Sequence, residues 1–243
     1  MHFRGCSGEP NRLPRSYHSG ETGDVAQFAA LLQAREPNTA LAAIGVSLGG
    51  NVLLKWLGES GANSPLVCAV AVSVPFELAK AADRLTLGFS QLYQWSLLRC
   101  LRESMKQKRQ QVPLPLKIQD FAKLKTFWEF DEHVTAPLHG FRGARHYYEA
   151  SSSRQYLRGI AVPTLLLQAR DDPFLQPTAI PNQSELSASV TLECYENGGH
   201  VGFVTGPWPW RARYWLDDRI PAFIGEQLAA HRKPKYSPRM ARR

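Results

Sequence analysis

The sequence contains no run of about 20 consecutive apolar residues, so it predicts no transmembrane helix. Residues 1–5 also lack the apolar stretch of a signal peptide, and we expect a cytoplasmic protein. Cysteine is scarce: the 4 cysteines are far apart and show neither CxxC nor CxxH spacing. This pattern argues against a zinc site, and a chain of 243 residues does not need a disulfide framework. Cys68 lies in an apolar run and is expected in the core.

Acidic residues are fewer than basic ones: the chain has 21 Asp and Glu and 29 Lys and Arg, which give a formal net charge of +8. An excess of this sign is compatible with a nucleic acid or a membrane surface as partner. Part of it lies in residues 231–243, which we expect to be a disordered basic tail, and part in residues 106–109. No nucleic-acid-binding motif is present, so we expect no nucleic-acid partner; peripheral membrane contact remains an alternative.

The apolar residues, 44% of the chain, are sufficient for the core of one large α/β domain. Short apolar runs predict strands at residues 40–46, 66–72, 163–169 and 190–195. Helical spacing predicts helices at residues 24–32, with Asp24 as N-cap, at 51–57, ending near Gly58, and at 213–230. Pro221 is expected to kink the last helix or delay its start. Alternating strands and helices predict a mostly parallel sheet with helices on both faces.

Two further segments complete this outline. Residues 2–8 are predicted to be a strand end that runs into a glycine-rich loop. Residues 76–159 form an insert too long for a simple crossover, and we expect a crossover plus a helical cap. The core would then comprise residues 1–75 and 160–230.

The insert contains aromatic, basic and histidine side chains near the expected site. Its aromatic residues either pack the cap or line an acyl pocket; they are Phe89, Tyr93, Trp95, Phe127, Trp128 and Phe130. Arg142 and Arg145 are either surface residues or contacts for a charged head group. His133, His139 and His146 are better placed for substrate contact than for catalysis.

The candidate nucleophile is Ser47, in the pattern Gly-x-Ser-x-Gly at residues 45–49. A serine hydroxyl needs exposure and a nearby base, and a sharp strand-to-helix turn supplies the exposure. An apolar strand precedes this pentapeptide and an apolar helix follows it, which is the context that the α/β-hydrolase fold requires. We attribute the turn to the flanking glycines, which permit a strained backbone and a close approach of helix and strand.

In this fold the chain order is serine, acid, histidine. His200 follows the last predicted strand in a glycine-rich loop and is the candidate base. Asp171 and Asp172 follow the strand at 163–169, and either carboxylate could reach His200. We favour Asp172 because the turn that precedes a proline can aim its side chain inward. The backbone N–H of Leu48 is the first oxyanion donor, and the second donor is expected upstream of Met1.

Beyond this pattern, the sequence resembles the bacterial YheT-type hydrolases, which are related to the eukaryotic ABHD1/ABHD3-like group and to plant EMB8-like proteins. The resemblance covers the chain except its basic tail and rests on residues 2–8, 45–51, 127–132, 135–141, 147–148, 169–174 and 198–203.

The resemblance implies the α/β-hydrolase fold, with Ser47, Asp172 and His200 as the charge-relay residues. It implies carboxylesterase or acylglycerol-lipase-like activity on short to medium acyl esters, a small-molecule ester or lipid substrate, and no cofactor. Members of the group are longer at the N-terminus, so we expect strands of the domain and an oxyanion loop to precede Met1. A catalytically impaired hydrolase and a basic protein that binds polyanions or membrane surfaces are the alternatives.

Overall fold

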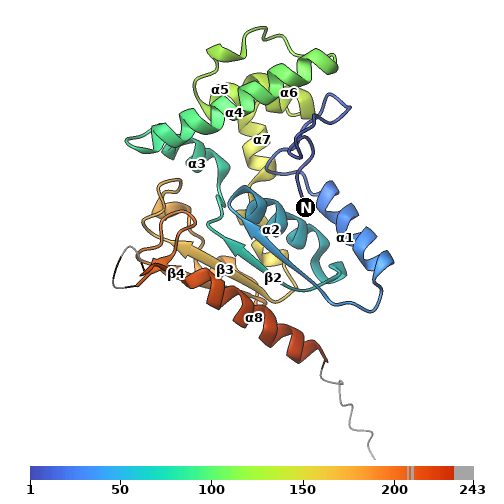
Figure 1. The fold of residues 1–243 in the computed structure, drawn as a ribbon, viewed down its shortest axis with the longest axis vertical. Coiled ribbons are helices and arrows are strands. Elements are labelled where there is room, and N and C mark those ends of the chain that lie inside the picture. The colour runs from blue at the N-terminus through green and yellow to red at the C-terminus, as the bar shows by residue number, and fades with distance from the viewer. Residues whose placement is uncertain (207, 209–210, 233–243) are drawn as a thin grey trace, which may run out of the picture.

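The computed structural model describes residues 1–206, 208 and 211–232. Its centre is a sheet of four parallel strands in the order β1-β2-β3-β4 (Figure 1). The strands are β1 (Leu41–Val46), β2 (Leu66–Val72), β3 (Thr164–Ala169) and β4 (Val190–Tyr195). All four lie where the apolar runs predict them, and the parallel arrangement confirms the predicted class of fold. Parallel strands place their carboxyl ends at one edge, where ligands of such sheets bind.

Helices cover both faces of the sheet (Figure 1). Helices α1 (Gly23–Arg35) and α2 (Leu48–Ser60) pack on one face, against Ala69, Ala71 and Leu166. Helix α8 (Trp215–Arg232) packs on the other, against Cys68, Val70 and Val72. Successive side chains of a strand alternate between faces, so β2 must be apolar at every position to serve both layers.

The segment between β2 and β3 forms a separate helical layer beyond the carboxyl edge of the sheet (Figure 1). Its helices are α3 (Leu78–Arg84), α4 (Ser90–Gln111), α5 (Phe127–Phe130), α6 (Ala136–His139) and α7 (Ala144–Ser151). A π-helical turn, η3 (Asp131–Thr135), joins α5 to α6. This layer has its own apolar cluster, built on Leu98, Phe121 and Phe130, and is hereafter called the cap.

Shorter elements complete the chain. The 3-10 turns are η1 (Gly61–Asn63), η2 (Phe121–Lys123), η4 (Ser153–Gly159), η5 (Pro177–Ala179) and η6 (Gln183–Glu185). Strands β5 (Val204–Thr205) and β6 (Arg213–Tyr214) form a two-stranded antiparallel pair just before α8. Among the residues that the structure describes, every helix falls short of the length and apolarity that a bilayer crossing requires.

Three predictions at element ends were wrong. Residues 2–8 form turns and bends rather than a strand end. Helix α1 begins at Gly23, so Asp24 lies in its first turn instead of capping it, and its carboxylate pairs with Arg4. Helix α2 begins directly after Ser47 and continues through Gly58 to Ser60.

At the C-terminus, α8 begins two residues later than predicted and extends two residues further. It starts six residues before Pro221, so the proline lies inside the helix and does not delay its start. The predicted basic tail begins within α8 at residues 231–232, and residues 233–243 lie outside the described part of the chain.

Candidate active site

Ser47 occupies the one-residue turn between β1 and α2, at the carboxyl edge of the sheet. Its backbone has φ 52° and ψ −121°, a left-handed conformation that side-chain-bearing residues rarely adopt. The turn is tied to the next strand, because Ser47 N–H donates to Val72 O at 2.8 Å. The surrounding hydrogen bonds therefore hold Ser47 in a strained conformation that raises its hydroxyl above the sheet edge.

The glycines around Ser47 have different roles. A Cβ at Gly45 would lie 2.6 Å from Gly49 O, and a Cβ at Gly50 would lie 2.6 Å from Val74 Cγ2. A Cβ at Gly49 would meet nothing within 4 Å. The close approach of β1 and α2 therefore requires Gly45 and Gly50, whereas the second glycine of the pentapeptide faces open space. The sequence attributes the close approach to the flanking glycines of the pentapeptide together; the structure bears this out for Gly45, and Gly50 rather than Gly49 is the second glycine without room for a side chain.

The candidate base and acid meet Ser47 in one chain of hydrogen bonds. His200 Nε2 lies 2.9 Å from Ser47 Oγ, and His200 Nδ1 lies 3.0 and 2.9 Å from the two carboxylate oxygens of Asp172. The Asp172 side chain is 1% exposed and that of His200 is 16% exposed. The arrangement orients the imidazole from both ends and keeps its partner carboxylate out of water.

The neighbouring aspartate has a different set of contacts. Asp171 Oδ1 accepts the backbone N–H groups of Gly198 and Gly199, at 2.9 and 2.8 Å. Asp171 therefore braces the loop that carries His200, and Asp172 reaches the imidazole itself. The sequence favours Asp172 over Asp171 as the partner of His200, and in the structure this contact belongs to Asp172.

An aromatic side chain fixes the imidazole from one face. The Phe174 ring stacks on the His200 ring with centroids 4.0 Å apart and planes at 18°. Phe174 N–H donates to Asp172 Oδ1 at 2.8 Å, so one short loop presents the carboxylate and the stacking ring together.

A cavity of about 130 Å³ opens beside Ser47 and His200. Its apolar wall comes mainly from α3 and the residues around it, and consists of Pro75, Leu78, Ala81, Ala82, Leu85, Phe127 and Phe174. Its polar wall comprises Ser19, Asp131, Tyr147 and Tyr148. The cavity has the shape and lining expected of a site for a small apolar group next to a reactive hydroxyl.

Of the insert aromatics, Phe127 lines this cavity. Phe130 is buried in the cap cluster, and Trp128 packs against Tyr148 while its ring N–H donates to Asp83 at 2.7 Å. Phe89, Tyr93 and Trp95 are 70%, 38% and 58% exposed and line neither the cavity nor the cap core.

The basic and histidine residues of the insert lie elsewhere. The Arg145 guanidinium lies 6.0 Å from the Trp128 ring centroid, and Arg142 N–H donates to His146 Nδ1. His139 Nε2 lies 2.9 Å from Ser16 O, so it joins the cap to the N-terminal loop. The structure records no hydrogen bond between these side chains and Ser47 or His200.

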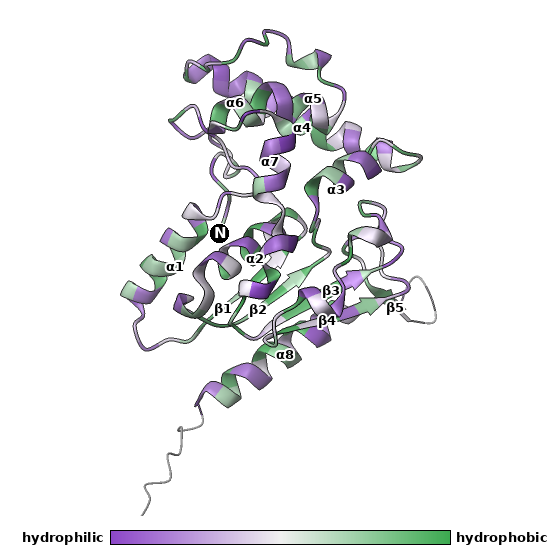
Figure 2. Ribbon diagram, turned by 180° about the vertical axis from the view of Figure 1, so that it is seen from behind, coloured by the Kyte–Doolittle hydropathy of each residue, from purple (hydrophilic) through white to green (hydrophobic). Residues whose placement is uncertain are grey.

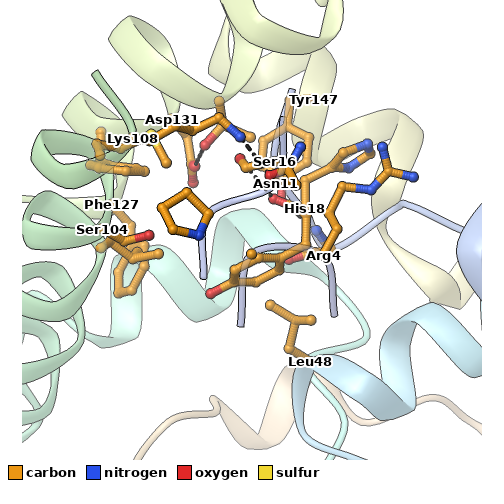
Figure 3. A pocket seen from close by; sticks show the side chains of 18 residues that line it. Arg4, Asn11, Ser16, His18, Leu48, Ser104, Lys108, Phe127, Asp131 and Tyr147 are labelled. Carbon is orange, nitrogen blue, oxygen red and sulfur yellow. Dashed lines mark hydrogen bonds between the residues drawn. The ribbon is translucent and has the colours of Figure 1, made fainter. Parts of the chain in front are cut away.

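A second cavity, of about 100 Å³, adjoins the first between the cap and residues 4–19 (Figure 3). Leu48 lines the side opposite to Lys108 and Asp131 (Figure 3). The Lys108 ammonium is buried and donates to Asn11 Oδ1 at 2.5 Å and to Arg15 O at 2.8 Å. Burial lowers the pKa of Lys108. These hydrogen bonds anchor α4 to the N-terminal loop.

Asp131 lines both cavities and was not recognised as a site residue from the sequence, although it belongs to the matching segment 127–132. Its carboxylate accepts hydrogen bonds from Thr135 at 2.5 Å and from Tyr148 at 2.6 Å. Burial raises the pKa of Asp131 to about 6, against the lowering effect of these two donors.

His18 lines the second cavity and was also missed, because no motif marks it in the sequence. Burial lowers its pKa to about 3, with a further contribution from His139, whose ring lies 4.5 Å away. His18 therefore stays neutral near pH 7. Within the described residues, no three His, Cys, Asp or Glu side chains gather as metal ligands.

The strained Ser47 lies between a parallel strand and a helix, and it meets a histidine and an aspartate from loops that follow later strands. This arrangement defines the class of α/β hydrolases. The family model of the alpha/beta hydrolase fold matches residues 1–207, and the chain belongs to this family. Within it, the chain is 41% identical to YheT of Escherichia coli (strain K12), named as a candidate esterase, over 95% of this chain and 68% of that protein.

Two other relatives carry lipase names. Phospholipase ABHD3 of Mus musculus is 32% identical over 94% of this chain and 56% of its own length. Monoacylglycerol lipase of Saccharomyces cerevisiae is 30% identical over 82% of this chain and 46% of its own. The chain thus spans about half the length of these two proteins. An alpha/beta fold family hydrolase from Bacillus anthracis str. Sterne shares the fold, with a TM-score of 0.52 at 15% identity, over 93% of this chain and 80% of that one.

Proposed function

We propose that this protein is a serine hydrolase that cleaves carboxylic esters through an acyl-enzyme on Ser47. The observation that carries the proposal is the hydrogen-bonded chain from Ser47 through His200 to Asp172, at the mouth of an apolar cavity. Its relatives are named esterases and lipases, which agrees with ester substrates. The reaction requires no cofactor.

In the first half-reaction, Ser47 Oγ attacks the ester carbonyl carbon while its proton passes to His200 Nε2, 2.9 Å away. Asp172 stabilises the imidazolium that forms, because its carboxylate accepts from Nδ1–H. The carbon–oxygen bond to the alcohol then breaks, and His200 returns the proton to the leaving oxygen. The products are the free alcohol and the acyl-serine.

In the second half-reaction, water gives a proton to His200 and attacks the acyl carbonyl. The bond to Ser47 Oγ breaks, His200 protonates that oxygen, and the carboxylic acid leaves. An alcohol in place of water would produce acyl transfer by the same steps.

The developing oxyanion is stabilised at the start of α2. Leu48 is the first residue of this helix, so its backbone N–H has no partner within the helix. The aligned peptide dipoles also place partial positive charge at this end. We assign the Leu48 N–H as one oxyanion donor.

The apolar lining of the cavity favours a short to medium acyl group as its occupant. That group would pack against Leu78, Ala82 and Leu85, on the wall that α3 and its C-terminal end provide. The lipase names of two relatives favour an acyl group esterified to a glycerol-type alcohol. A series of p-nitrophenyl esters from acetate to decanoate measures the acyl preference, and we expect a maximum at short or medium length.

The test of the mechanism compares wild type with Ser47→Ala and His200→Ala on the preferred ester. Each variant should lose activity by roughly 10⁴- to 10⁶-fold, because the three groups act as a unit. Turnover that stays unchanged in these variants rules out the proposed triad. A fluorophosphonate probe should label wild type at Ser47; labelling without ester turnover would instead indicate a catalytically impaired hydrolase.

A further inference from the structure

The corner between α3 and α4 exposes an unusual number of large apolar side chains. It projects from the side of the cap (Figure 2). Its members lie within eleven consecutive positions and are Leu87, Phe89, Leu92, Tyr93, Trp95 and Leu97, each at least 38% exposed. We call this set the α4 patch. Contiguous exposed apolar surface of this kind marks an interaction site more often than chance.

The polarity of these helical turns is inverted. The buried side of the same turns carries Ser90 and Gln94, which are 1% and 5% exposed. Ser90 Oγ donates to Pro173 O at 2.6 Å, and Gln94 Oε1 accepts from Phe127 N at 3.2 Å. A surface helix ordinarily buries its apolar face and exposes its polar one. Packing of the cap therefore does not account for the outward phenylalanine, leucine and tryptophan.

The α4 patch is continuous with the candidate active site. The Phe89 and Tyr93 rings lie 5.8 Å apart, and Tyr93 lies 4.8 Å from Phe174, which stacks on His200. Leu85, two residues before the patch, lines the catalytic cavity. An apolar substrate could therefore pass from a surface bound to the patch into the cavity along apolar side chains.

Positive charge follows the patch along the same helix. Helix α4 contains five cations and one carboxylate, Glu103. Of the cations that follow the patch, Arg99 and Lys106 are exposed, whereas Arg102 and Arg109 are half-buried and donate to carbonyl oxygens of the cap. The Arg99 guanidinium lies 5.6 Å from the Trp95 ring centroid. Aromatic and leucine side chains beside exposed cations are the features of helices that lie in an anionic lipid interface. Because these cations lie beside the apolar patch, we favour an anionic lipid surface as its partner over the apolar groove of another protein.

We propose that the α4 patch binds a lipid surface bearing anionic headgroups, so that the enzyme takes its ester from that surface. The delivery of substrate rests on the proposed esterase function, whereas binding of the surface does not. Binding and turnover are therefore measured separately.

The experiment is co-sedimentation with vesicles of phosphatidylcholine containing 30% phosphatidylglycerol, and with vesicles of phosphatidylcholine alone. The double variant Leu92→Ser/Trp95→Ser removes two exposed apolar side chains of the patch. The matched control, Phe28→Ser/Leu31→Ser, removes two exposed apolar side chains of α1, remote from the cap. Trp95→Phe keeps an aromatic ring and serves as the conservative variant, and Ser47→Ala reports binding without hydrolysis.

We expect wild type, Ser47→Ala, Trp95→Phe and the α1 control to sediment with anionic vesicles. The double variant should partition at least about tenfold less, and 0.5 M NaCl should weaken the binding of wild type. The double variant should hydrolyse a water-soluble p-nitrophenyl ester at the wild-type rate but a vesicle-borne ester more slowly.

Three results overturn the proposal. In the first, wild type stays in the supernatant with both vesicle types. In the second, the double variant sediments like wild type. In the third, wild type does not bind vesicles but forms a dimer that the double variant dissociates, which would make the patch an interface between copies of this chain. Binding of vesicles without any ester turnover would support the lipid site and count against the hydrolase function alone.

Discussion

The adjacent residues Asp172 and Asp171 should respond very differently to replacement by asparagine: we expect a large loss of kcat in the first case and almost none in the second. Asp172 is the carboxylate of the candidate triad: both its oxygens lie within 3.0 Å of His200 Nδ1, and its side chain is 1% exposed. At ~3 Å and an effective dielectric constant of ~20, Coulomb's law gives about 5.5 kcal/mol between this carboxylate and an imidazolium. At about 1.4 kcal/mol for each tenfold in rate, Asp172→Asn should lower kcat by roughly 10⁴-fold.

Asp171→Asn should remain within about threefold of wild type. Asp171 uses one oxygen, which accepts from Gly198 N and Gly199 N, and an asparagine carbonyl oxygen can accept the same two hydrogen bonds. Asp171→Ala removes both bonds from the histidine loop. At ~1 kcal/mol for each of the two lost bonds, the cost is at most ~2 kcal/mol, and we expect kcat to fall by up to about thirtyfold in this variant.

The assay is the kcat and KM of the three variants on the preferred p-nitrophenyl ester, with thermal unfolding as a control for folding. An effect on Asp171→Asn as large as that on Asp172→Asn would refute the division of roles between the two carboxylates. Near-wild-type kcat for Asp172→Asn would refute the electrostatic role of Asp172.

Two further predictions concern stability. Gly45→Ala should destabilise the fold by about 1–3 kcal/mol, because its Cβ would meet backbone atoms at 2.6 Å. Gly49→Ala, in open space within α2, should be neutral or stabilising by up to ~1 kcal/mol; equal losses in chemical unfolding would contradict the packing argument. Asp131 stays protonated in the fold up to about pH 6 but ionises near pH 3.8 when unfolded. The stability that its neutral form provides is complete below pH 3.8 and is lost as the pH rises through about 6. Relative to Asp131→Asn, the unfolding free energy of wild type should therefore fall by about 3 kcal/mol between pH 3.5 and 7. A pH-independent difference in urea unfolding would show that burial does not perturb this carboxyl.

The strands and the candidate nucleophile could be predicted from the sequence because their signals are local. Strands covered on both faces are almost entirely apolar, so the runs at 66–72 and 163–169 match β2 and β3. The partly alternating run at 190–195 matches β4, the edge strand, whose residues after Val190 are only half-buried or exposed. Ser47 lies between such a run and a helix, and His200 follows the last run in a glycine-rich loop. Chain order and strand ends were enough to nominate the residues that the fold brings into contact.

Tertiary structure decided the features that depend on contacts between distant segments. The turn before Pro173 favoured Asp172, but the separate roles of Asp172 and Asp171 depend on how each carboxylate contacts a loop about 28 positions away. Burial of Asp131 between two cavities requires η3 and α7 to meet, and no local pattern reports that contact. The outward face of α4 could not be read from its composition, because the polar side chains that it buries are satisfied by partners from other elements. Local pattern thus determined which residues are candidates for the chemistry, and packing determined which of them touch.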